Sequence, residues 1–127
     1  MTWRDDTVNK NGITERAFDL TVNDQNVPGV YWRPEKNDAS RIALLGHGGS
    51  THKKVEYIQL VATMLVERGI AAMAIDGPGH GERASENRIQ SPDGFVDIWN
   101  EGGGTDGIMA DWKAALDFIE SEEGGRP

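Results

Sequence analysis

Two short apolar runs, each followed directly by a glycine-rich segment, constrain the fold of this chain more than any other sequence feature. The first run covers residues 41–45 and leads into residues 46–50. The second is Ile70–Ile75, which leads into residues 76–81. Continuous rather than alternating apolar residues are typical of parallel strands that are covered on both faces. We therefore predict two buried strands and place residues 41–45 in the centre of a sheet.

An amphipathic helix is predicted between these two strands. Its apolar stripe follows a 3.6-residue period and consists of Tyr57, Ile58, Val61, Met64 and Leu65. Gly69 stands where a helix commonly ends in a left-handed residue. A strand, a helix and a strand within about forty residues form a βαβ unit with parallel strands and a right-handed crossover.

A β-hairpin is predicted ahead of this unit, within residues 13–33. Residues 17–22 alternate between apolar and polar side chains, which is the period of a half-buried strand. Residues 23–26 favour a turn, and residues 30–32 supply β-branched and aromatic side chains for a second strand.

A polar, irregular stretch and a further helix follow the second buried strand. Residues 82–104 are long for a structureless connection, so they either line a site or contain a short helix. The helix after them is capped by Thr105 or Asp106. Its apolar stripe comprises Ile108, Met109, Trp112, Ala115, Leu116 and Ile119. The predicted fold class is thus α/β: a hairpin, a parallel βαβ unit and a further helix, in one domain or part of one.

Charge and composition limit the partners of the chain. Its formal net charge is −8, so it gains nothing from neutralising phosphates, and neither nucleic acid nor an anionic membrane is an expected partner. It has no cysteine, so no disulfide or thiolate chemistry is expected. Its start is polar, and no stretch approaches the roughly 20 apolar residues of a membrane span. We therefore expect a soluble, cytoplasmic protein.

The segment Gly46-His47-Gly48-Gly49-Ser50 has the composition of an oxyanion-binding turn. Acyl transfer passes through a tetrahedral oxyanion, which preorganised N–H donors stabilise in a water-poor site. Closely spaced glycines let a turn aim such donors at one point and let a substrate approach. The alternative is a glycine-rich turn between a strand and a helix that binds no ligand.

The second glycine-rich segment, DGPGHG at residues 76–81, makes the comparison more specific. A strand ending in His-Gly, a helix, and a strand ending in Asp-x-x-Gly-His-Gly occur in this order in α/β-hydrolase-fold proteins. The chain resembles that superfamily from Ala17 to Ile119, and most of all its dienelactone-hydrolase and peptidase-like esterase branch. The resemblance implies a three-layer sandwich of which residues 1–127 form the first half, a partial domain.

The resemblance also implies roles for individual residues. Gly49 matches the position whose N–H contributes to the oxyanion hole, and Gly48 and Ser50 flank it. The residues implied to shape the loops beside the site are His47, Asp76, Gly79, His80 and Gly81. We expect His80 to stabilise a turn by hydrogen bonding rather than to transfer protons. Because both segments follow parallel strands, we expect them to lie at neighbouring strand ends.

The nucleophile of this superfamily is missing from the sequence. It lies in a G-x-S-x-G motif between a strand and a helix, and the acid and histidine follow it. No such motif occurs here, because Ser50 follows Gly49 but lacks the downstream glycine, and Ser85, Ser91 and Ser121 lie in polar contexts. We therefore assign no catalytic serine, histidine or acid and expect the chain alone to be inactive. The sheet edge that the nucleophile strand would pair is expected to stay open and to promote self-association.

Three functions follow from these features. The first is hydrolysis of ester or related acyl bonds in a small-molecule substrate, without metal or organic cofactor. The second is a non-catalytic α/β-hydrolase-like fragment or binding module. The third is a nucleotide-binding module, because residues 102–107 fit G-x-G-x-x-G ahead of a helix.

Two further groups of side chains bear on these functions. His47, His52 and His80 could hold a metal, but histidines on glycine-rich turns are more often backbone partners, so we expect no metal site. His52, Lys53 and Lys54 place positive charge beside the oxyanion segment. They either attract a carboxylate-bearing substrate or form a solvated helix start, and the solvated start is the simpler interpretation.

Overall fold

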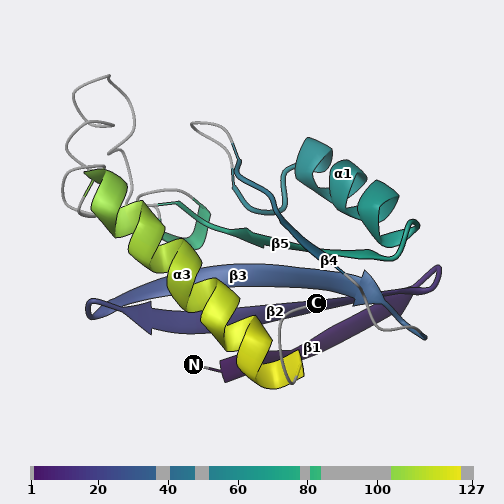
Figure 1. Cartoon of the computed structure of the whole chain (residues 1–127), viewed down its shortest axis with the longest axis horizontal. Coiled ribbons are helices and arrows are strands. Elements are labelled where there is room, and N and C mark those ends of the chain that lie inside the picture. The colour runs from purple at the N-terminus through teal and green to yellow at the C-terminus, as the bar shows by residue number, and fades with distance from the viewer. Residues whose placement is uncertain (1, 37–40, 48–51, 78–80, 84–103, 124–127) are drawn as a thin grey trace.

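The computed structural model describes residues 2–36, 41–47, 52–77, 81–83 and 104–123. Within these ranges the chain forms a mixed sheet with a helix on each face (Figure 1). The elements are β1 (Thr2–Lys10), β2 (Ile13–Val22), β3 (Gln25–Pro34), β4 (Arg41–Leu44), α1 (Glu56–Val66), β5 (Ile70–Ile75), the 3₁₀ turn η1 (Gly81–Arg83) and α3 (Gly104–Glu123). The described strands lie in the order β1-β2-β3-β5-β4.

β1, β2 and β3 form an antiparallel meander. Asn11 and Gly12 connect β1 to β2 with φ values of 55° and 79°, and Asn23 and Asp24 connect β2 to β3 with 49° and 63°. Two-residue turns with positive φ match the right-handed twist of the strands they join. The predicted hairpin is confirmed as β2 and β3, and β1 is an additional, unpredicted strand.

β4, α1 and β5 form the predicted βαβ unit. β4 pairs parallel with β5, in a register that runs from Arg41 opposite Ile70 to Leu44 opposite Met73. On its other side β5 pairs antiparallel with β3. The carboxyl ends of β4 and β5 therefore lie side by side at one edge of the sheet, and the prediction of parallel strands is confirmed.

Among the described strands, β4 has the open edge that we predicted for a chain without the nucleophile strand, but its side chains are less buried than we expected. It is the last strand of the sheet in the described part of the chain, and its neighbour is β5. Leu44 is consequently 42% exposed. A strand with one neighbour leaves a row of backbone N–H and C=O groups open. Its apolar sequence suits a covered position, but nothing in the described residues covers its outer edge.

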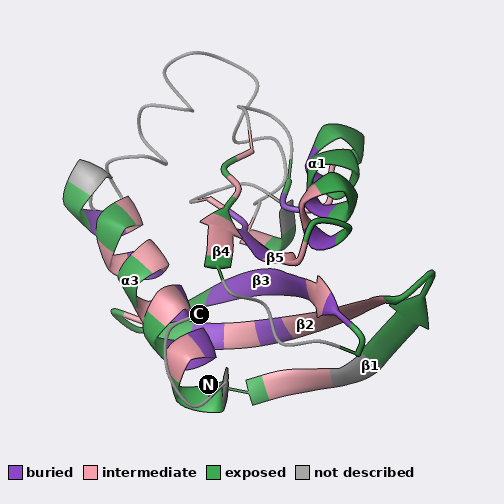
Figure 2. Cartoon of the chain, turned by 45° about the vertical axis from the view of Figure 1, so that its right-hand side comes forward, coloured by how far each residue is buried: buried purple, intermediate pink, exposed green. Residues whose placement is uncertain are grey.

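Buried residues concentrate in β3 and β5 (Figure 2), and they contribute to a core on each face of the sheet. The core beneath α3 contains Phe18, Leu20, Val27, Tyr31, Ala71, Met73, Ile75, Ala115, Phe118 and Ile119. The core beneath α1 contains Val30, Trp32, Ile58, Ala62, Val66, Ala72 and Ala74. Successive residues of β5 thus point into opposite cores, as the period of a strand requires. This is a three-layer α/β arrangement.

α1 buries a different face from the one we predicted. Its buried residues are Ile58, Ala62 and Val66. Its exposed apolar residues, here called the α1 outer face, are Tyr57, Leu60, Val61 and Met64. The helix carries apolar residues around more than one side, so periodicity alone does not decide which arc meets the sheet. Gly69, with φ of 77°, is the left-handed residue expected after the helix.

α3 begins at Gly104, ahead of both predicted capping residues, so Asp106 lies in its first turn. Ala115 and Ile119 are buried as predicted, whereas Met109 is 64% exposed and Phe118 takes a place in the core that we did not predict. Most of the predicted irregular stretch lies outside the described residues. No helix in the described ranges is long and apolar enough to cross a bilayer.

Candidate functional site

The two predicted loop segments meet at the carboxyl ends of β4 and β5. The backbone N–H of Gly77 donates a hydrogen bond to Nε2 of His47 at 2.9 Å. A Cβ added to Gly77 would lie 3.5 Å from the same atom, so the imidazole packs directly against the Gly77 backbone. Because Nε2 accepts this bond, the ring proton of a neutral His47 resides on Nδ1. His47 therefore joins the two segments, as expected of a residue that shapes the site.

Several predicted site residues lie outside the described residues. They are Gly48, Gly49, Ser50, Gly79 and His80. Gly81 is described as the first residue of η1. The oxyanion-hole assignment to Gly49 and the turn-stabilising role of His80 remain predictions.

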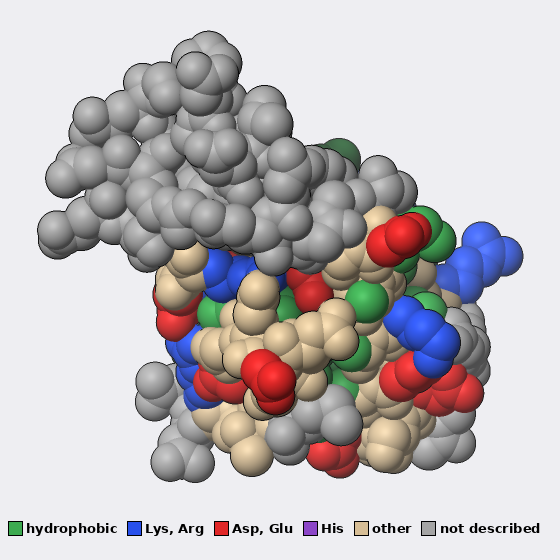
Figure 3. Space-filling view, turned by 90° about the vertical axis from the view of Figure 1, so that its left-hand side faces the viewer, with side chains coloured by type: hydrophobic (Ala, Val, Ile, Leu, Met, Phe, Trp, Pro, Cys, Tyr) green, Lys and Arg blue, Asp and Glu red, His purple; other side chains and the backbone are tan. Residues whose placement is uncertain are grey.

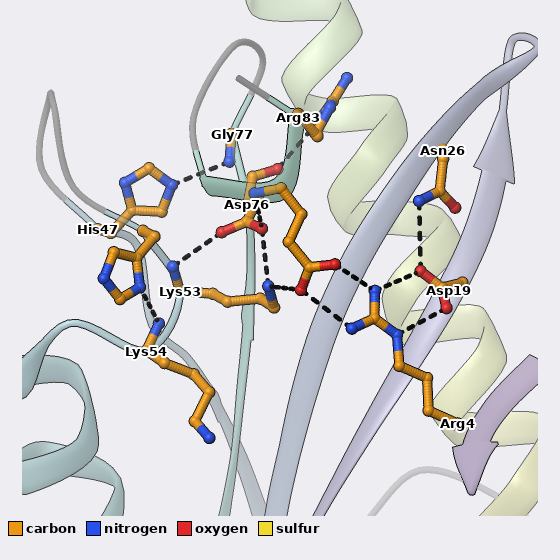
Figure 4. Close-up of polar contacts among 11 residues, drawn as sticks. Arg4, Asp19, Asn26, His47, Lys53, Lys54, Asp76, Gly77 and Arg83 are labelled. Atoms are coloured by element: carbon orange, nitrogen blue, oxygen red, sulfur yellow. Dashed lines mark hydrogen bonds and ion pairs between the residues drawn. The ribbon is translucent and has the colours of Figure 1, made fainter. Parts of the chain in front are cut away.

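Asp76 is the hub of the hydrogen bonds around these loops (Figure 4). Its side chain is fully buried. Oδ1 accepts a hydrogen bond from the Lys53 backbone N–H at 2.9 Å. Oδ2 accepts from Lys53 Nζ at 2.7 Å and from the Glu82 backbone N–H at 3.0 Å. A buried carboxylate is tolerated only when it is paired and hydrogen-bonded, and this one is saturated. Asp76 therefore holds the described residues Lys53 and Glu82 together, and its role in shaping the loops stays a prediction.

Lys53 has a different environment from either of the two we predicted. It is 5% exposed, and its Nζ forms ion pairs with Asp76 at 2.7 Å and Glu82 at 2.9 Å. It is neither a solvated residue of a helix start nor a free cation for a substrate. His52 and Lys54 differ from it, since His52 is exposed and Lys54 is partly exposed. Lysine is so rarely buried that its sequence context gave no signal of this role.

The ion pairs extend from Lys53 across the sheet to β1. Glu82 pairs with Arg4 at 2.7 Å, and Arg4 pairs with Asp19 at 2.8 Å. The hydrogen bond from Arg4 is the main cause that lowers the pKa of Glu82 to about 2, and it also lowers the pKa of Asp19. These two carboxylates in turn raise the pKa of Arg4. The unpredicted strand β1 thus anchors η1 beside the loops.

Arg83 ties the same turn to the other face of the molecule. Its guanidinium donates to the Asp76 carbonyl oxygen at 3.2 Å and to the Asp111 carboxylate on α3 at 2.9 Å. A third bond goes to Gln25 at 2.8 Å. Both side chains of the Arg83–Asp111 pair are 7% exposed. Arg83 therefore links the end of β5, α3 and the start of β3.

An open groove of about 600 Å³ lies beside the ion pairs. Its lining consists of Arg4, Thr7, Val8, Glu15, Ala17, Val30, Lys53, Lys54 and Glu82. Among the described residues neither His47 nor Gly77 borders it, so it is separate from the contact between the loops. Acidic and basic side chains are intermixed on the side of the molecule shown in Figure 3. The described residues contain no group of three potential metal ligands.

Known structures identify the fold to which these loops belong. No protein-family model and no curated protein matches the chain. The PEG-bound structure of a cold-adapted esterase from an Arctic intertidal metagenomic library is 55% identical, with a TM-score of 0.87, over 100% of this chain and 53% of that chain. A zinc-bound structure of a cold-adapted esterase from such a library is 49% identical, with a TM-score of 0.78, over 100% and 51%. The chain has an esterase-type α/β fold.

More distant structures share this fold. A putative acetyl xylan esterase from Bacteroides fragilis NCTC 9343 is 16% identical, with a TM-score of 0.68, over 91% of this chain and 37% of that chain. The chain corresponds to the N-terminal part of such esterase structures and spans about half the length of the cold-adapted esterases.

The predicted nucleotide-binding fingerprint, residues 102–107, lies at the start of α3 in this fold. The second glycine of the motif, Gly104, is the first residue of α3, and the third, Gly107, is buried inside that helix. The strand that should precede a dinucleotide fingerprint would fall in residues 95–99, outside the described residues. Nothing in the described structure adds to the nucleotide-binding hypothesis.

Proposed function

We propose that this chain is the N-terminal part of a serine hydrolase that cleaves ester or related acyl bonds and that it supplies the oxyanion-binding segment. The observation that carries the proposal is the 55% identity to a cold-adapted esterase along the whole chain. On the strength of the two glycine-histidine segments, we assign it to the dienelactone-hydrolase and peptidase-like esterase branch. The Ser–His–acid mechanism of such enzymes uses neither a metal nor an organic cofactor.

In this proposal the Gly49 N–H stabilises the oxyanion, with Gly48 and Ser50 beside it. Support comes from the residues on either side of that segment. His47 and Lys53 both lie at the carboxyl ends of parallel strands, which is where open α/β sheets bind their ligands. Asp76 contributes no acid–base chemistry, because all of its carboxylate contacts serve the loops.

The nucleophile, the acid and the catalytic histidine come from further polypeptide in this proposal. The described structure offers two adjoining surfaces for it. β4 has an open edge next to which Leu44 is exposed, and the α1 outer face presents four apolar side chains. A strand added to β4 and a helix laid over α1 would cover both. An esterase about twice as long as this chain has the material to do so.

Complementation tests this proposal directly. The chain is co-expressed with the C-terminal part of the 55% identical esterase, and the pair is assayed with p-nitrophenyl acetate and a fluorophosphonate probe. We expect hydrolysis by the pair and labelling of a serine on the added part. Gly49→Pro removes the proposed donor and should lower kcat by about 10²–10³-fold. Lys113→Ala is the control, since this side chain lies on α3, outside the segment, and is 78% exposed.

Two results would refute parts of the proposal. If the two parts assemble but neither hydrolyse the ester nor react with the probe, the chain is better explained as a non-catalytic binding module. If the probe labels a serine of this chain, our conclusion that it lacks a nucleophile is wrong.

A further inference from the structure

The two ends of the segment that contains the proposed oxyanion donors are held by two consecutive residues, one at each end. On its N-terminal side, His47 accepts a hydrogen bond from the Gly77 N–H at 2.9 Å. On its C-terminal side, Lys53 donates its backbone N–H to Asp76 at 2.9 Å. Asp76 and Gly77 are consecutive residues at the end of β5. Figure 4 shows the imidazole of His47 beside Gly77 and the side chain of Lys53 beside Asp76.

This arrangement restricts the path of the intervening backbone. Lys53 lies six positions after His47 along the chain, and a fully extended stretch of that length would span roughly 20 Å. Their two anchors are instead adjacent in sequence on a rigid strand end. His47 and Lys53, the described residues on either side of the segment, are therefore both held at the end of β5.

Lys53 holds its end more firmly than a backbone contact alone would. Its Nζ bonds to the carboxylate that also receives its own backbone N–H, so the two bonds fix both its position and its orientation. Glu82 adds a third contact to Nζ at 2.9 Å and is itself held by Arg4. The Lys53 side chain is only 6% exposed.

The energetics of buried ion pairs favour a geometric role over a stabilising one. Removing two charges from water costs about as much as their attraction returns, so an apolar pair of similar size is often equally stable. Unlike apolar side chains, such a pair fixes the orientation of the groups that it joins. Productive geometry in an active site is needed to within about 0.5 Å, and residues outside the reaction centre supply it.

We propose that Lys53, through its paired backbone and side-chain bonds to Asp76, is a positioning residue that sets the placement of the oxyanion-binding segment. This inference rests on the proposed function. Lys53 touches no substrate and transfers no proton. It acts by fixing the C-terminal end of the segment, while His47 fixes the N-terminal end.

The chain contains a matched control for this role in the next residue. Lys54 has the same side chain, but it is 43% exposed and reaches Glu15 only at 3.3 Å. In the complemented enzyme, Lys53→Met should lower kcat about 10²-fold with KM changed less than threefold, because misplacement by about 1 Å costs that much. Lys54→Met should change kcat less than twofold.

Two further variants separate positioning from stability. Lys53→Met combined with Asp76→Asn leaves no unpaired buried charge and keeps an acceptor for the Lys53 N–H, so its melting temperature should lie closer to that of the parent than that of Lys53→Met alone, while kcat stays low. Asp76→Asn keeps an acceptor for the Lys53 N–H but removes the charge, and its kcat should be intermediate. A kcat that follows the melting temperature across these variants would overturn the proposal.

Amide hydrogen exchange of the chain itself gives a readout that does not require catalysis. Lys53→Met should increase exchange at residues 46–53 at least tenfold, and Lys54→Met should not. An inactive parent complex would refute the proposed function, and the exchange data would then still decide whether Lys53 holds the segment. Equal exchange in the two variants would overturn the positioning role even if the parent complex is active.

Discussion

Replacing Gly29 with alanine should destabilise the chain because the site has no room for a methyl group. Gly29 lies on β3 opposite Phe18 of β2 and opposite Ile75, the residue before Asp76. A Cβ at Gly29 would lie 2.2, 2.5 and 2.8 Å from three atoms of the Phe18 ring. The ring would have to move by about 1 Å to restore ordinary van der Waals contact.

The surroundings of Phe18 resist that movement. Its side chain is fully buried, with the Trp3 ring 5.8 Å away in an edge-on arrangement and the Phe118 ring 5.4 Å away. Overpacking of a close-packed core costs typically 1–3 kcal/mol, and a rigid aromatic cluster belongs at the upper end. We expect Gly29→Ala to lower the free energy of unfolding by about 3 kcal/mol and the melting temperature by about 10 °C.

Urea unfolding followed by tryptophan fluorescence measures this effect. Gly46→Ala is the control, because its new Cβ meets no atom within 4 Å. In the double variant Gly29→Ala with Phe18→Leu, removal of the ring atoms should make the total loss smaller than the sum of the two single losses. A loss below about 0.5 kcal/mol for Gly29→Ala, or strictly additive losses, would show that the ring is not held as described.

Three further predictions follow from the ion pairs and the exposed apolar side chains. Arg4 lowers the pKa of Glu82 from 4.5 to about 2. The stability that this pair contributes is therefore complete above about pH 4.5 and is lost as the pH falls toward 2. In Arg4→Met, the urea concentration at the midpoint of unfolding should depend less on pH over that range. Arg83→Met leaves the buried Asp111 carboxylate on α3 without its ion-pair partner, so it should lower the free energy of unfolding in urea by about 3 kcal/mol. A loss under about 1 kcal/mol would contradict this prediction. We also propose that the chain alone self-associates through β4 and the α1 outer face, so that Leu60→Glu lowers its mass by light scattering while Gln59→Glu does not; a monomeric parent would refute this.

Some signals for the unpredicted elements were present in the sequence. Asn11-Gly12 is a strong indication of a two-residue hairpin turn, and it marks the junction of β1 and β2. The polar composition of residues 2–10 hid this strand, because most of its described side chains are exposed or partly exposed. For Lys53 no comparable signal existed, since a buried lysine depends on carboxylates far away in the sequence.

Local sequence patterns were sufficient to predict the helix and the two strands of the βαβ unit. Continuous apolar runs, a helical stripe and glycine at strand ends determine that β4, α1 and β5 form a parallel unit, and parallel pairing alone places His47 near Gly77. These features depend on residues close together in the chain, where backbone geometry and side-chain period act directly.

Tertiary structure decided what those patterns left open. It determined which arc of α1 meets the sheet, how far the side chains of β4 are exposed, and that Lys53 and Asp76 form a buried pair. Each of these depends on which distant segments arrive at the same place, and a one-dimensional period carries no such information. The environment of a side chain is set by its neighbours in space, so the same lysine that sequence places in solvent becomes an internal anchor once β5 and η1 surround it.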